Sequence, residues 1–125
     1  MELTKQTPAG GLQVIQGYGR AGFKVSGVRH EGSILVLPDQ TMSWRVGKTS
    51  ELTLQSLKPI IETNPAIEIV IVGCGASLSM LPLTLLEVMR SKKIGIESMD
   101  TGAACRTFNV LVGEGRRVAA ALIAL

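Results

Sequence analysis

The chain has 125 residues, of which 46% are hydrophobic and 18% are charged; these proportions exclude an intrinsically disordered protein and favour a single domain over residues 1–125. The net charge is only +3, and the cations are scattered rather than gathered in a basic stripe, so we expect no nucleic-acid partner. No apolar run approaches the roughly 20 residues of a membrane-spanning helix, so we expect no membrane insertion.

Cellular location is predicted from the cysteines and from the N-terminal residues. The chain has 2 cysteines, too few for a disulfide framework. Residues 1–5 show neither the apolar core of a secretory signal nor the arginine-rich pattern of a transit peptide. We therefore expect a protein of the reducing cytoplasm.

The N-terminal half shows the alternating pattern of half-buried strands. Residues 1–11 end in a proline and two glycines, and we expect them to form a flexible arm. Apolar and polar side chains alternate over residues 23–28, and the turn residues that follow connect this predicted strand to a second one over 33–37. The two strands are predicted to pair as a hairpin. Further short strands are predicted over 12–15 and 41–46.

After Pro65 the pattern changes to alternating strands and helices. The predicted elements are strands over 67–72, 94–98 and 116–125 and helices over 81–91 and 103–112. Crossovers of one hand make these three strands parallel. A shorter helix, capped by Ser56, precedes them. The sequence thus predicts an α/β fold: a mixed central sheet with a parallel β-α-β-α-β C-terminal half, an N-terminal antiparallel hairpin layer, and helices on one face.

The glycine turn Gly73-Cys74-Gly75, which follows an apolar β-branched strand, is the most probable place for a site. Such a turn lies at the carboxyl edge of parallel strands, where ligands of α/β proteins usually bind. The free amides of a following helix suit a phosphate, and Glu97 stands where a ribose-binding acid is expected. A dinucleotide fingerprint, however, needs a glycine where this chain has Leu78. We therefore favour a tight structural turn over a nucleotide site.

Arg106 lies in the first turns of the predicted helix over 103–112. A cation there is unfavourable to the helix dipole unless a negative group lies beside it. That group is either an acid of the chain, Asp100 or Glu97, or the carboxylate or phosphate of a ligand, which guanidinium binds through two hydrogen bonds. Both alternatives stay open.

The cysteines offer a further hypothesis. Cys74 and Cys105 both fall near predicted helix starts, where the pKa of a thiol is lowered. The chain's single histidine, His30, lies in a predicted turn with no visible route to either thiol. We therefore expect small buried thiols, no catalytic residue and no metal site.

Motifs over nearly the whole chain resemble those of a known family. They are Gly17-Tyr18-Gly19, Gly32-Ser33-Ile34 before Pro38, Trp44, the glycine turn, residues 101–109, Leu111, Glu114–Arg117 and Val118–Leu122. The chain resembles the Mth938-like family, which includes the mitochondrial complex I assembly factor 3 and an adipogenesis-associated protein. The resemblance implies a compact three-layer α/β domain, no established enzymatic activity and, in the mitochondrial branch, a protein-binding role in assembly of a respiratory complex. The chain departs from the family at Cys74, where threonine is more common, and at Phe108, where tyrosine is.

We therefore predict a bacterial, non-enzymatic domain of the cytoplasm that acts through protein contacts in an assembly-factor-like role. The alternative is a small-molecule or anion-binding protein, or an enzyme, that uses the carboxyl edge of the parallel strands. The residues predicted to line that edge are Gly73, Gly75, Ser77, Thr101, Arg106 and Thr107. No cofactor is predicted. The expected partner is a protein, and a small anion or a homodimer stays open beside it.

Overall fold

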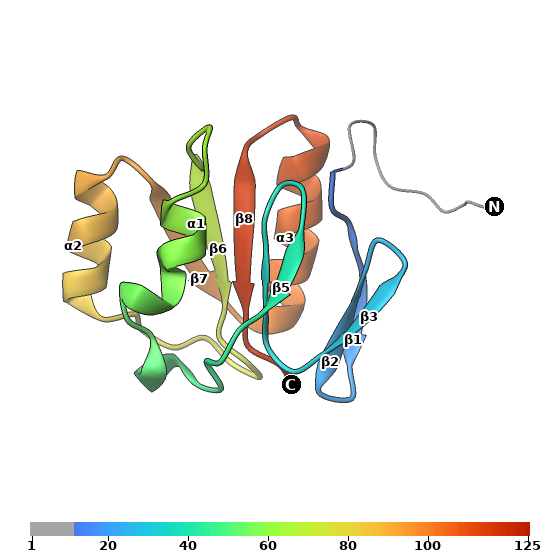
Figure 1. Cartoon of the computed structure of the whole chain (residues 1–125). Coiled ribbons are helices and arrows are strands. Elements are labelled where there is room, and N and C mark those ends of the chain that lie inside the picture. The colour runs from blue at the N-terminus through green and yellow to red at the C-terminus, as the bar shows by residue number, and fades with distance from the viewer. Residues whose placement is uncertain (1–11) are drawn as a thin grey trace.

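Residues 12–125 are described by a computed structural model of the chain, which contains two β-sheets (Figure 1). The arm predicted over residues 1–11 lies outside this part of the chain. The larger sheet has five strands in the order β5-β4-β8-β6-β7. Their bounds are Ile34–Val36 for β4, Thr41–Ser43 for β5, Ile69–Gly73 for β6, Gly95–Met99 for β7 and Val118–Leu122 for β8.

The three C-terminal strands of this sheet are parallel, as the sequence predicts. β6 pairs with both β7 and β8 in parallel register, so that Val70 lies between Ile96 and Ala119. The β-branched run of β6 is buried because a strand flanks it on each side and other layers cover its two faces. β4 and β5 add to the β8 side as antiparallel strands. The predicted α/β fold with a mixed sheet and a parallel C-terminal half is therefore confirmed.

The smaller sheet differs from the predicted N-terminal hairpin. It is an antiparallel meander of β1 (Ile15–Gly19), β2 (Gly22–Val25) and β3 (Val28–Glu31). The predicted strand over 23–28 is broken at Ser26 and Gly27, whose φ angles of 47° and 87° form a two-residue turn of the kind that joins tight hairpins. The predicted strand over 33–37 pairs instead with the larger sheet, so the proposed hairpin between these two segments is wrong.

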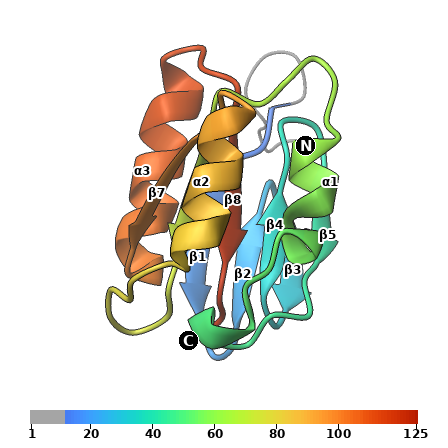
Figure 2. The same cartoon turned by 90° about the vertical axis from the view of Figure 1, so that its left-hand side faces the viewer.

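The helices lie on both faces of the larger sheet, so the prediction of helices on one face is wrong (Figure 2). Their bounds are Lys58–Ile61 for α1, Leu83–Ser91 for α2 and Thr101–Gly113 for α3. α2 connects β6 to β7, and α3 connects β7 to β8 in the opposite direction across the sheet. Because crossovers of this kind are right-handed, connections that run in opposite directions place their helices on opposite faces.

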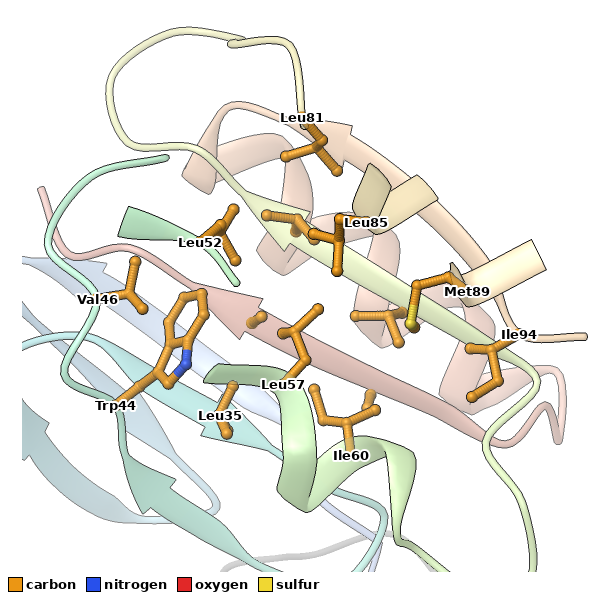
Figure 3. Close-up of a cluster of buried hydrophobic side chains, with 14 of the residues drawn as sticks. Leu35, Trp44, Val46, Leu52, Leu57, Ile60, Leu81, Leu85, Met89 and Ile94 are labelled. Atoms are coloured by element: carbon orange, nitrogen blue, oxygen red, sulfur yellow. The ribbon is translucent and has the colours of Figure 1, made fainter. Parts of the chain in front are cut away.

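One core fills the space between α1, α2 and the larger sheet. Ile60 from α1, and Leu85 and Met89 from α2, are buried there and face the sheet (Figure 3). Trp44 closes the side of this core, and its Nε1 donates a hydrogen bond to the carbonyl of Ser56 at 2.8 Å. α1 begins at Lys58, so Ser56 precedes the helix by two residues instead of capping it.

A second core joins α3, the smaller sheet and the opposite face of the larger sheet. Phe23 from β2 and Phe108 from α3 are fully buried in it. Asn109 fixes β1 to α3, because its side-chain oxygen accepts from the Ile15 amide at 2.9 Å and its side-chain nitrogen donates to the Ile15 carbonyl at 2.8 Å. The larger sheet is therefore the middle of three layers, as the family resemblance implies.

Candidate functional site

The predicted site lies at the carboxyl edge of the parallel strands, where β6 ends in Gly73-Cys74-Gly75. A Cβ atom on Gly73 would lie 3.0 Å from Leu122 Cδ2 and 3.0 Å from Thr101 Oγ1, so only glycine fits without a shift of its neighbours. Gly75 has a φ of +96°, a backbone region that favours glycine. The turn is therefore a close-packed crossing of β6, β8 and the start of α3.

Thr101, the first residue of α3, ties this crossing together and is fully buried. Its hydroxyl accepts a hydrogen bond from the Gly75 amide at 2.9 Å and donates one to the Ile123 carbonyl at 2.7 Å. Its own amide donates to the Gly75 carbonyl at 2.9 Å. A hydroxyl has a single proton to donate, so the donor of Thr101 is already used within the fold.

The start of α3 already carries a negative group. The carboxylate of Asp100 caps the helix and accepts a hydrogen bond from the Ala103 amide at 2.9 Å. Tyr18 from β1 lies over the same turn, because a Cβ atom on Gly102 would be only 2.6 Å from its hydroxyl oxygen. The helix end that would attract an anion is thus occupied by one carboxylate and flanked by a phenol.

The remaining predicted residues form no hydrogen bond with the glycine turn. Ser77 is exposed in the connection between β6 and α2. The Thr107 hydroxyl lies 3.3 Å from the sulfur of Met99. Arg106 is exposed on α3 and forms no ion pair with any residue from 12 to 125, so of the two alternatives left open for it, the pair with Asp100 or Glu97 is not present in the structure.

The connection after the glycine turn is longer than the phosphate hypothesis requires. α2 begins at Leu83, with Pro82 as its N-terminal flanking residue, two residues later than predicted. The glycine turn is therefore followed by an irregular segment, and the first amides of α2 do not continue directly from it.

Both thiols are buried, and they lie in different cores on opposite faces of the larger sheet. Cys74 belongs to the core beneath α2, and Cys105 to the core beneath α3. Burial raises the pKa of the Cys105 thiol to about 12, although nearby Arg106 acts in the opposite direction. His30 lies on β3, paired with Phe23. In the described part of the chain, no group of three His, Cys, Asp or Glu residues is placed to hold a metal ion.

An apolar surface that was not predicted from the sequence surrounds α2. Its exposed side chains are Met80 (93% exposed), Leu83 (68%), Leu78 (64%) and Leu54 (41%). The helix predicted over 81–91 starts only after Pro82, and the residues before it form a connection in which Leu78 and Met80 are exposed. Pro82 was the signal in the sequence that could have identified this surface, because a proline favours a helix start over a helix interior.

Hollows lie on both sides of α2. Two hollows of about 390 and 260 Å³ flank Leu54 between α1 and α2. Two more, of about 400 and 310 Å³, lie along β7 on the other side of the helix. Exposed apolar side chains beside hollows are typical of surfaces that bind other proteins. None of the helices between residues 12 and 125 has the length and apolar character needed to cross a membrane.

The fold and the edge geometry define a three-layer α/β domain of the Mth938-like class. A solved Bordetella pertussis structure described as a Mth938-like domain is 29% identical, with a TM-score of 0.80, and the match covers 98% of this chain and 92% of that one. A Bartonella henselae structure described as an outer membrane protein is 36% identical, with a TM-score of 0.84, over 91% of this chain and 96% of that one.

The chain belongs to the family described as a protein of unknown function (DUF498/DUF598), whose model matches residues 15–123. It is also 39% identical over 109 residues to the NADH dehydrogenase (ubiquinone) 1 alpha subcomplex assembly factor 3 of Xenopus tropicalis. That match covers 87% of this chain but only 60% of the relative, so the chain spans about three-fifths of the relative's length. The resemblance to the family that includes this assembly factor is confirmed.

Proposed function

We propose that this protein is a non-enzymatic bacterial assembly factor of the cytoplasm, which binds a subunit of a multisubunit complex while that complex is put together. The observation that carries the proposal is the 39% identity to a protein named as an assembly factor of NADH dehydrogenase. That name makes NADH dehydrogenase the first candidate for the complex. Its subunits are accordingly the first candidates for the partner.

The surface between α1 and α2 supports the proposal physically. Leu54 is exposed between the two hollows of this surface, and Leu83 is exposed at the start of α2. Lys92 lines the larger hollow and forms no ion pair within the described chain, whereas Lys58 lies 3.8 Å from Glu62. The partner that fits is therefore a protein segment with apolar side chains for the hollows and an acidic residue near Lys92.

Cross-linking in cells tests the proposal. We would express the tagged full chain, the double variant Leu54→Asp/Leu83→Asp, and the control Val110→Asp, which changes an exposed apolar residue on α3. NADH dehydrogenase subunits should be captured by the wild type and the control and lost from the double variant. Circular dichroism would verify that all three chains are folded.

Two results would contradict this function. Equal capture by the double variant and the wild type would exclude the α1–α2 surface as the contact. Unchanged levels of assembled NADH dehydrogenase on native gels after deletion of the gene would exclude the assembly role in that complex.

An anion-binding function is a second candidate, and one observation favours it. Arg106 is exposed and free of ion pairs with residues 12–125, so its guanidinium is available to a carboxylate or phosphate. The carboxylate of Asp100 at the start of the same helix counts against it, because like charges repel. A sulfate titration of wild type and an Arg106 variant separates these effects.

A further inference from the structure

We propose that β7 is the contact between two copies of this chain, which pair antiparallel about a two-fold axis at Ile96 and join two five-stranded sheets into one. The inference does not depend on the assembly role, because it concerns the purified protein alone. It rests on the free edge of β7, on the hollows beside that edge, and on the distribution of charge along it.

β7 is the last strand of the larger sheet, and no strand within residues 12–125 covers its outer edge. The Gly95 amide donates to the Glu68 carbonyl at 2.8 Å, and the Met99 carbonyl accepts from the Cys74 amide at 2.8 Å. Because backbone groups alternate in direction along a strand, Ile96 and Ser98 present their amides and carbonyls to the outside. These groups are ready to pair with another strand.

The α2 side of this edge is an incomplete apolar layer. Hollows of about 400 and 310 Å³ lie there, and Leu86 and Ile96 line both of them. Arg90 lines the first hollow, and Met80, which is almost fully exposed, lines the second. A strand added to β7 alone would leave these hollows open, whereas a second copy brings its own α2 layer with it.

The charges along β7 differ between its two ends. Arg90 and Lys93 line the hollow beside the N-terminal end of β7, and neither forms an ion pair within the described chain. The C-terminal end carries Glu97 and Asp100. An antiparallel second copy places the basic end of each chain against the acidic end of the other, and symmetry forms this favourable contact twice.

The register follows from the same residues. With the axis at Ile96, the two copies of this residue face each other and exchange both backbone hydrogen bonds, and Gly95 lies opposite Glu97 of the second copy. An axis one residue later would place the two Glu97 carboxylates face to face, which is destabilising. The charge pattern therefore selects an apolar residue for the centre of the contact.

A charge exchange at the axis tests this arrangement. Sedimentation equilibrium of the wild type over a range of concentrations should show a monomer–dimer equilibrium. Ile96→Lys and Ile96→Glu should each be monomeric, because each places two like charges on the axis. An equimolar mixture of the two variants should recover a dimer, since a lysine then meets a glutamate, and a general loss of stability cannot produce that result.

Matched variants and a disulfide complete the test. Val28→Lys and Val28→Glu alter an exposed apolar residue on the edge strand β3, and both should dimerise like the wild type. Ile96→Cys should form an inter-chain disulfide on mild oxidation, because opposed residues of this kind have Cα atoms about 5.5 Å apart. The wild type should form none, since Cys74 and Cys105 are buried.

Several results would overturn the proposal. A wild type that stays monomeric at every concentration refutes it, and so does a dimer that both Ile96 variants retain. If the wild type is a dimer but the mixture of Ile96→Lys and Ile96→Glu stays monomeric, the two-fold axis does not lie at Ile96 and the proposed contact is wrong. A monomeric wild type that captures a different protein in cells, in a manner that Ile96→Lys abolishes, assigns the edge to another partner.

Discussion

Replacing Thr101 by valine keeps the shape of the side chain and removes its hydroxyl. In the wild type this hydroxyl joins the Gly75 amide at 2.9 Å to the Ile123 carbonyl at 2.7 Å, in a fully buried position. In Thr101→Val both backbone groups lose this partner, and the close packing around Gly73 leaves little room for a water molecule.

The cost follows from these two groups. A buried donor or acceptor that loses its partner costs about 1–3 kcal/mol, so the pair costs about 2–6 kcal/mol. The variant no longer buries a hydroxyl and gains an apolar methyl, which offsets roughly 1–2 kcal/mol. We expect a net loss of about 1–4 kcal/mol in the free energy of unfolding, or roughly 4–16 °C in Tm at about 4 °C per kcal/mol.

Urea unfolding followed by circular dichroism measures the change through the midpoint at constant m-value. Thr107→Val is the matched control, because the same chemical change removes only a contact of 3.3 Å to the sulfur of Met99, a weak acceptor. That control should cost less than about 1 kcal/mol. If Thr101→Val proves as stable as Thr107→Val, the hydroxyl bridge does not hold the edge together and our account of it is refuted.

Three further predictions concern ionisable groups. The hydrogen bond from the Arg117 amide, and then the one from the Arg116 side chain, hold the pKa of Glu68 below its ordinary 4.5. The stability that ionised Glu68 gives the fold is therefore present above pH 4.5 and is lost as the pH falls through the folded-state pKa. Glu68→Gln should remove this part of the acid sensitivity in urea titrations at several pH values. Cys105, whose pKa burial raises to about 12, should resist maleimide at mildly alkaline pH until the protein is unfolded, and fast labelling of the native chain would contradict its burial. Arg106→Ala should change the unfolding free energy by less than about 0.5 kcal/mol. Sulfate that raises the Tm of the wild type but not of this variant would support the anion candidate, and no response in either would reject it.

Much of the parallel half of the fold could be predicted because its signals are local. The β-branched run of β6 has the composition of a strand buried on both faces, and it is one. Asp100 stands directly before an apolar periodic segment, where an aspartate typically caps a helix, and the structure shows that it is the cap of α3. The faces of the helices were not predictable, because they depend on β6 lying between β7 and β8, and no residue pattern encodes that order.

The N-terminal error has a different cause. Residues 23–28 alternate apolar and polar side chains through Ser26 and Gly27, so the pattern reads as one strand. The left-handed φ angles at these two residues fold the segment back, and Val25 pairs with Val28 across the turn. A serine–glycine pair is a known turn signal, and in this segment it outweighs the alternation.

At the glycine turn the sequence indicates a place without indicating how its polar groups are used. Thr101 was predicted as a lining residue for a ligand, yet its hydroxyl joins residues 26 and 22 positions away in the chain. Ser77 and Arg106 are close in sequence to this edge, but the structure leaves both exposed without a hydrogen bond to the turn. Such long-range bonds depend on the packing of β6, β8 and α3 together.

The use of polar groups also explains why we place the protein contacts around α2 and β7. A ligand at the glycine turn would have to compete with hydrogen bonds that Thr101 and Asp100 already make, and each broken bond subtracts from the binding free energy. A partner at β7 breaks none, because the outward backbone groups of Ile96 and Ser98 have no strand beside them in the described chain. Burial of Met80 there adds favourable apolar contact. The binding free energy of a partner is therefore more favourable at the β7 edge than at the glycine turn that the sequence singles out.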